Sequence, residues 1–142
     1  MVEITISDAV GSVSPAQQSA ATLKVLQDVV EERARQILRE GFCPSHDDQH
    51  QDFSMAKAAS VYAACASVGT ADRAVMDQNG LRGTPGKLQE IWPISWDISW
   101  LKPVSRRRDL IKAAALIVAE IERLDRLEAS AHLKASVEGG EA

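Results

Sequence analysis

All three tryptophans of the chain fall in one short segment, and a row of arginines follows it directly. An indole ring offers a flat face for stacking, and a guanidinium group binds phosphate or carboxylate through paired hydrogen bonds. The segment therefore predicts a binding site for a ligand with a flat ring and an anionic group, such as a nucleotide. The residues predicted to form this site are Trp92, Trp96, Trp100, Arg106, Arg107, Arg108 and Asp109.

Both halves of this segment have a structural alternative. Aromatic residues make up only 4% of the chain, so the tryptophans could serve to complete a thin core. The arginines fall in the first turn of a predicted helix, where the helix dipole disfavours positive charge. An anion bound at the exposed amides would explain them, and so would a solvated basic turn paired with Glu32, Asp47 or Asp48.

A second polar cluster, HDDQH, lies in a loop after the first predicted helix and contributes His46, Asp47, Asp48 and His50 to the predicted ligand site. Imidazoles and carboxylates bind divalent cations, and they also hydrogen-bond sugar hydroxyls. The spacing matches no zinc signature, and a polar loop whose aspartates cap turns is the structural alternative. The candidate metal ligands are His46, Asp48, Glu32 and Glu120.

Glu120 lies in the apolar run of the last predicted helix, so its carboxylate needs a partner and becomes a candidate site residue. Arg123, one turn later, is the structural partner that we expect. Asp109 falls on roughly the same helical face, but the 1.5 Å rise per residue places the two carboxylates about 16 Å apart. They cannot share one metal ion.

The first helix is predicted over residues 15–40, because Ser14, Pro15 and Gln17 form a capping box with proline at the first helical position. Apolar residues recur at helical spacing and predict its core face, and polar residues fall on the opposite, solvated face. The core face contains Leu23, Leu26, Val30, Ala34 and Ile37, and the solvated face contains Glu32, Arg35, Gln36 and Arg39.

An alanine-rich second helix is predicted from Ser54 or Asp52 to about Val68, and a short helix follows over 71–78. A segment punctuated by glycine and proline then carries the tryptophans. Ser105 caps the last helix, which is predicted to end at about Leu133 and to occupy a central position. Its main apolar stripe consists of Leu110, Ala114, Ile117, Ile121 and Leu124.

These elements predict a mainly α fold: a small single-domain helical bundle with an irregular segment, rich in Trp, Pro and Gly, before the last helix. Residues 1–13 are predicted to form a flexible arm or an edge strand. Residues 14–133 form the helical domain, and residues 134–142 a disordered tail.

Composition narrows the function classes. A net charge of −4 with 25% charged residues argues against nucleic acid as a partner. Two cysteines are too few for a disulfide scaffold, and the chain begins without a signal-peptide pattern or membrane span, so we expect a cytoplasmic protein. The absence of a phosphate-binding glycine loop or a nucleophile motif favours binding without catalysis and without a resident cofactor, although a divalent cation fits the acidic loop. The alanine-rich helix faces suit a homo-oligomer.

Most of residues 32–126 resembles a family of small uncharacterised proteins encoded by bacteriophages and prophages. The matching blocks are ERARQILREGFCPSHDDQH (32–50), the helix with Ala58, Ala59 and Tyr62, the Trp-Pro pair at 92–93, and RRRDLIKAAALIVAEIERLDR (106–126). This resemblance implies a phage setting, in the cytoplasm of the host cell. A broader similarity is to all-α nucleotide pyrophosphohydrolases of the MazG type, which carry paired glutamates on one helix facing a Glu and an Asp on the next. Glu31-Glu32 matches the first of these elements in part, and this chain has no match to the second.

The leading hypothesis is therefore a phage accessory protein that binds a nucleotide-like small molecule without catalysis, for example to sequester a host defence signal. The tryptophans would stack on the base, the arginines would hold phosphate, and the HDDQH loop would contact sugar hydroxyls. One alternative is a metal-dependent nucleotide hydrolase that uses the acidic loop with Glu32 and Glu120. Another is a protein-interaction module whose tryptophan segment docks on a host protein.

Overall fold

The computed structural model describes residues 12–40, 47–48 and 52–140, and within these ranges the chain forms helices and no strand. This confirms the predicted mainly α fold in a single domain. The α-helices are α2 (Pro15–Glu40), α4 (Ser54–Ser67), α5 (Thr70–Asn79), α6 (Gly86–Gln89) and α7 (Arg106–Gly139), and two 3₁₀ turns are η1 (Gly80–Gly83) and η2 (Ile98–Trp100).

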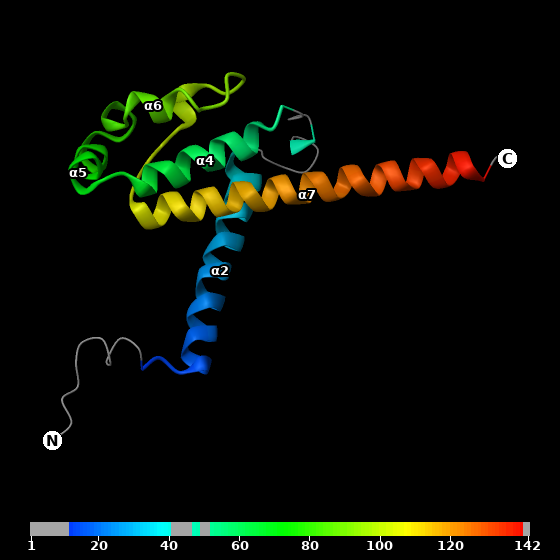
Figure 1. Ribbon diagram of the computed structural model, residues 1–142, viewed down its shortest axis with the longest axis horizontal. Helices are drawn as coiled ribbons and strands as arrows, with labels where there is room; N and C mark the ends of the chain where they lie inside the picture. The colour runs from blue at the N-terminus through cyan, green and yellow to red at the C-terminus, as the bar shows by residue number, and fades with distance from the viewer. Residues whose placement is uncertain (1–11, 41–46, 49–51, 141–142) are drawn as a thin grey trace.

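The core forms where α4 lies along the first half of α7 (Figure 1). Small side chains such as Ala58, Ala59 and Ala113 line the contact and are almost completely buried. They allow the two helices to approach closely, so larger residues can fill the space around them. Trp92 and Trp96, from the segment that follows η1, complete this core.

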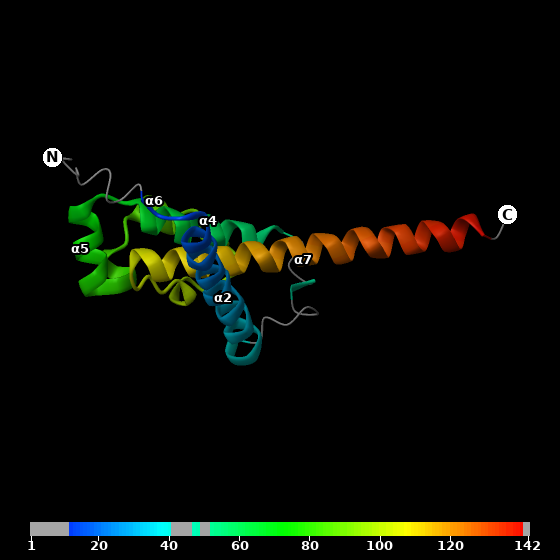
Figure 2. The ribbon, with the colours of Figure 1, turned by 90° about the horizontal axis from the view of Figure 1, so that it is seen from below.

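Helix α2 crosses α7 and forms a second, smaller apolar contact (Figures 1 and 2). Val29 packs there against Ile111 and Ala115. Ion pairs flank this contact. In one of them, Nη2 of Arg33 lies 3.2 Å from Oε2 of Glu122. The crossing brings the polar end of α2 next to the tryptophan segment.

Helix boundaries follow the predicted capping chemistry. At the start of α2 the Ser14 amide donates to Gln17 Oε1 (2.8 Å), and the Gln17 amide donates to Ser14 Oγ (3.1 Å). At the start of α7 the Ser105 hydroxyl accepts a hydrogen bond from the Arg108 amide (3.1 Å). α5 ends at Asn79, and the next residue, Gly80, has a φ of 58°, which suits glycine. The capping box and the α7 cap are therefore confirmed.

The predicted faces of α2 were wrong. Leu23, Leu26 and Val30 are more than half exposed, and Val30 reaches 67%. The buried residues are Val29, Glu32, Arg33 and Gln36. The polar face is the one that meets α7 and the pocket described below, because its charged groups find partners there that the sequence pattern does not reveal.

Helix α7 is central, as predicted, because both α2 and α4 pack on it, but its main apolar stripe is largely exposed. Ile117 and Ile121 are 48% and 52% exposed. The core side of α7 instead consists of small or paired residues, among them Ala113, Ala119 and Glu120. Contact with α4 needs close approach, so alanines are buried and the larger aliphatic side chains are left outside.

Helix α7 continues past its predicted end at Leu133 to Gly139, so residues 134–139 are helical rather than a disordered tail. The predicted arm or strand at residues 1–13 lies mostly outside the described residues. No helix in the described part of the chain is both long and apolar enough to cross a membrane.

Gly83 is expected to be the glycine least tolerant of substitution. A Cβ at this position would lie 2.6 Å from the Val75 carbonyl oxygen, which is backbone and cannot rotate away. We expect Gly83→Ala to lower the free energy of unfolding by about 1–3 kcal/mol, as overpacking does in protein cores. Urea denaturation followed by circular dichroism measures this. Gly86→Ala, whose Cβ would meet nothing within 4 Å, is the control and should leave the midpoint almost unchanged.

Candidate ligand-binding pocket

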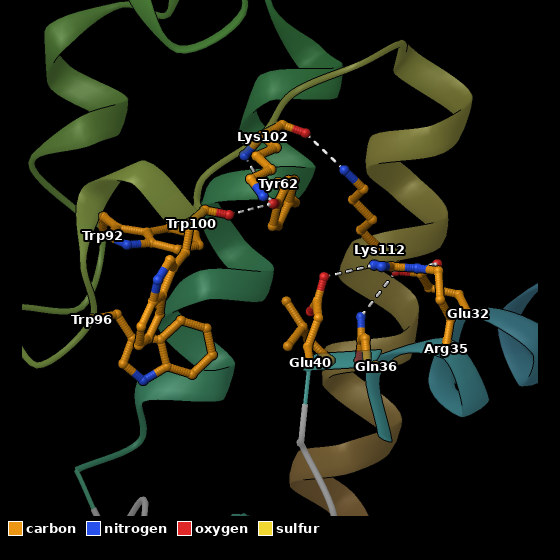
Figure 3. Close-up of a pocket in the computed structure, with 11 residues that line it drawn as sticks. Glu32, Arg35, Gln36, Glu40, Tyr62, Trp92, Trp96, Trp100, Lys102 and Lys112 are labelled. Carbon is orange, nitrogen blue, oxygen red and sulfur yellow. Dashed lines mark hydrogen bonds and ion pairs between the residues drawn. The ribbon is translucent and has the colours of Figure 1, made fainter. Parts of the chain in front are cut away.

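A pocket of about 350 Å³ opens where α2, α4, α7 and the tryptophan segment meet (Figure 3). One wall is aromatic and the other is charged. Its lining residues are Glu32, Arg35, Gln36 and Glu40 from α2, Tyr62 from α4, Trp92, Trp96, Trp100 and Lys102 from the tryptophan segment, and Lys112 and Leu116 from α7.

The three tryptophans pack on one another as an aromatic wall. Trp92 and Trp96 meet edge to face with ring centroids 5.6 Å apart, and Trp96 and Trp100 are tilted at 6.0 Å. Trp92 and Trp96 are buried, whereas Trp100 is 49% exposed. The structural alternative therefore holds for Trp92 and Trp96, which complete the core. All three tryptophans line the pocket, and their role in ligand binding stays a prediction.

Tyr62 attaches this wall to α4. Its hydroxyl donates to the Trp100 carbonyl (3.3 Å) and accepts a hydrogen bond from the Lys102 amide (3.1 Å). Burial raises the pKa of Tyr62 to about 12, so the hydroxyl stays protonated at neutral pH and remains a donor. The Trp100 backbone is thus fixed relative to the helices.

Lys112 brings a positive charge to the floor of the pocket from α7. Its Nζ donates to the Lys102 carbonyl (2.7 Å) and lies 5.3 Å from the centroid of the Tyr62 ring. The side chain is buried, and this desolvation lowers the pKa of Lys112 below the ordinary lysine range. A buried ammonium with one carbonyl partner still has hydrogen-bonding capacity for an anion.

The opposite wall, from α2, combines both signs of charge. Arg35 donates to both oxygens of Glu32 (2.8 and 2.7 Å) and to Glu40 (3.0 Å). Burial raises the pKa of Glu32, but hydrogen bonds from Arg35 and Arg108 outweigh it and hold that pKa below the ordinary value. Three lining cations, Arg35, Lys102 and Lys112, thus face two carboxylates, one of which is also neutralised from outside the lining by Arg108.

The predicted arginine turn does not line this pocket. Arg106 donates to the carbonyls of Ala66 (2.8 Å) and Val68 (2.6 Å), so it satisfies the carboxyl end of α4, where the dipole favours a cation. Arg107 pairs with Asp28 (2.5 Å) and Arg108 with Glu32. The structural alternative, an acidic partner, therefore holds for Arg108 with Glu32, which lines the pocket, whereas Arg107 pairs with Asp28, a partner that was not predicted.

The two described aspartates of the acidic loop also form ion pairs with arginines. Asp47 is buried with Arg33 Nη2 at 2.7 Å, and Asp48 lies 2.8 Å from Arg126. Neither aspartate lines the pocket. His46 and His50 lie outside the described residues, so their predicted role stays a prediction.

The remaining candidate carboxylates lie on α7. Glu120 accepts from Arg123 Nε (2.8 Å), the partner expected from the sequence. Asp109 accepts from Arg73 (2.7 Å) and from the Val104 amide (2.9 Å). Within the described ranges, no three histidine, cysteine or acidic side chains come together as a metal site.

The sequence did not single out the cations that do line the pocket. Lys112 is a lone basic residue inside the apolar run of α7, which was the available signal. Arg35, Gln36 and Glu40 recur on one face of α2, but the apolar stripe beside them drew the core prediction. Lys102 and Tyr62 carry no signal that sequence spacing alone would reveal.

The fold and the site together define a mainly α domain with one aromatic wall and one charged wall around a small pocket. Comparison of the chain with models of protein families, with curated proteins and with solved structures finds no match. The function must therefore be argued from the pocket.

Proposed function

We propose that the protein binds a nucleotide-like small molecule in this pocket without catalysing its conversion. The observation that carries the proposal is the convergence of Trp100, Tyr62 and Lys112 on one cavity of about 350 Å³. Small-molecule sites combine largely apolar walls with a few placed polar groups, and this volume falls at the lower end of their usual range. A mononucleotide matches the combination of ring surface and fixed cations.

In the proposed complex the planar ring of the ligand stacks against the open side of Trp100. Its anionic group extends toward Lys112, Lys102 and Arg35. Because Lys112 is buried, its attraction to an anion is less weakened by solvent than that of a surface lysine. The amide of Gln36 and the carboxylate of Glu40 offer acceptors for donors on the base or sugar.

Non-catalytic binding is favoured over the hydrolase alternative by the way the carboxylates are held. That alternative uses His46, which lies outside the described residues, with four carboxylates. These carboxylates lie in separate ion pairs with different arginines, and they belong to Asp47, Asp48, Glu32 and Glu120. Only Glu32 lines the pocket. The alternative in which the tryptophans dock on a protein is weakened because Trp92 and Trp96 are buried.

The biological setting in this proposal rests on the sequence resemblance to phage and prophage proteins. A small binding protein of this kind, made in the host cytoplasm, would act by holding a nucleotide signal away from its receptor. Such a role needs affinity and abundance, and it needs no turnover.

Isothermal calorimetry and native mass spectrometry against mononucleotides, cyclic nucleotides, nucleosides and inorganic phosphate test the proposal. We expect one nucleotide class to bind with one ligand per chain, and nucleosides to bind more weakly. Trp100→Ala should lower the affinity by about 5- to 150-fold, the range of base–aromatic stacking at about 1–3 kcal/mol.

Arg107→Ala is the matched control, because Arg107 does not line the pocket and pairs with Asp28 on the surface. It should leave affinity unchanged, whereas the sequence-based site would lose affinity with it. Chromatography of the recovered ligand decides between binding and hydrolysis. Failure of every nucleotide to bind would overturn the proposal, and release of phosphate or pyrophosphate would replace it with the hydrolase.

A further inference from the structure

One side of α7 carries large aliphatic side chains that the described part of the chain leaves about half exposed. Ile111 and Ala115 contact α2, and Ala113, Leu116 and Ala119 belong to the core shared with α4. The remaining side of the helix presents a stripe whose leucines and isoleucines are 44% to 52% exposed, together with Ala114, which is partly buried beside the contact with α2. We call Leu110, Ala114, Ile117, Ile121 and Leu124 the outer stripe.

The spacing of the outer stripe is nearly the same in both directions along the helix. Its members follow one another at intervals of four, three, four and three residues, the spacing by which helices pack side by side. Turned end over end about Ile117, the stripe places Leu110 opposite Leu124 and keeps Ile117 at the centre. Such a self-complementary pattern suits a two-fold contact, in which the same patch is used on both copies.

Charge along α7 supports the same arrangement. The helix begins with three arginines, and the acids Asp125 and Glu128 follow the outer stripe at its other end. In an antiparallel pair centred on Ile117, Arg107 of one copy would lie close to Glu128 of the other. Glu128 is exposed, and no ion pair of the described residues includes it. Parallel pairing would instead align like charges.

The shape of the molecule leaves room for such a partner. The second half of α7 extends beyond the other described elements in both ribbon views (Figures 1 and 2). An isolated helical segment of this length is only marginally stable in water unless a packed face supports it. In an antiparallel pair centred on Ile117, α7 of the partner would lie along this helix as far as about residue 128, so it would cover the outer stripe and the beginning of the extended half.

We propose that two copies of this chain form a two-fold symmetric dimer in which the outer stripes of α7 pack antiparallel about Ile117. The dimer is held by the aliphatic stripe at its centre and by Arg107–Glu128 pairs between copies at both ends. The inference does not rest on ligand binding, because the pocket lies within one chain.

Sedimentation and light scattering over a wide range of protein concentrations test the dimer. We expect the mass of the wild type to be twice the 15.4 kDa of the chain. Ile117→Asp places two carboxylates at the two-fold axis and should weaken dimerisation by at least about 100-fold, since uncompensated burial of charge is strongly unfavourable. Leu133→Asp is the matched control: Leu133 is an exposed leucine of the same helix outside the outer stripe, and its variant should dimerise normally.

Charge reversal tests the antiparallel register separately. Arg107→Glu and Glu128→Lys should each weaken the dimer, and the double variant should restore it because each new glutamate again faces a lysine. This pair also answers the question if Ile117→Asp fails to fold. A monomeric wild type, equal loss in Leu133→Asp, or no restoration in the double variant would overturn the proposal.

Discussion

Replacing Asp109 with alanine will lower the free energy of unfolding by about 3–5 kcal/mol, the usual cost of removing one partner of a buried ion pair. Asp109 is completely buried, and its two carboxylate oxygens serve two different groups. One oxygen accepts from Arg73 and the other from the Val104 amide. The variant leaves the buried Arg73 guanidinium with less charge compensation and also leaves a backbone donor without its acceptor.

Asp77→Ala is the matched control for this experiment. Asp77 also pairs with Arg73 at 2.7 Å, but its side chain is about half exposed. Exposed ion pairs contribute about 0–1 kcal/mol, so the control should change the unfolding midpoint only slightly. Chemical denaturation monitored by circular dichroism compares the two. Equal losses in both variants would show that Asp109 does not have the structural role assigned to it.

Asp109 was included in the predicted ligand site, but its contacts in the structure give it a role in stability instead. Following the arginine row, it resembled part of an anion site, yet it joins the start of α7 to α5 through Arg73. Neither the contact with Arg73 nor the contact with Val104 can be predicted from the spacing of residues in the sequence. Long-range pairs of this kind are the part of a site that spacing alone cannot supply.

Local signals predicted the helices well, because capping and helix termination depend on neighbouring residues. Ser14 with Gln17, and Ser105, each act at the predicted boundary. The faces of α2 and α7 could not be predicted in the same way. Apolar periodicity shows which residues avoid water, and it does not say whether the covering surface belongs to the same chain.

This distinction connects the wrong face predictions with the proposed dimer. The outer stripe of α7 has the periodicity of a core face but lies outside the core of the single chain. If a second copy covers it, the pattern was interpreted correctly as a packing face and only its partner was misassigned. In the tryptophan segment the error was of another kind. The three tryptophans line one pocket, as the prediction grouped them, but the cations that line it with them include Lys112 and Arg35 rather than the adjacent arginines.

Lys112 is where the proposed ligand site should be most sensitive to mutation. Lys112→Met keeps most of the aliphatic volume and removes the buried positive charge. A hydrogen bond to a charged group contributes about 1.5–3 kcal/mol, so we expect nucleotide affinity to fall by about 10- to 150-fold. Calorimetry measures the loss. Lys134→Met, at an exposed position on α7 outside the pocket, is the control and should bind like the wild type.

The pH dependence of binding distinguishes the contribution that the charge of Lys112 makes to affinity from the contribution of its side-chain volume. Desolvation lowers the pKa of Lys112, so its ammonium form is present below that lowered pKa and is lost as pH rises through it. The phosphate group of a nucleotide keeps a constant charge well above its own pKa of about 6. Affinity should therefore begin to fall at a pH below the range of an exposed lysine, whose pKa is about 10.4. Lys112→Met should abolish this decline while the arginine contribution persists, because Arg35 stays protonated throughout. A decline of equal size in the methionine variant would show that another group, and not Lys112, holds the anion.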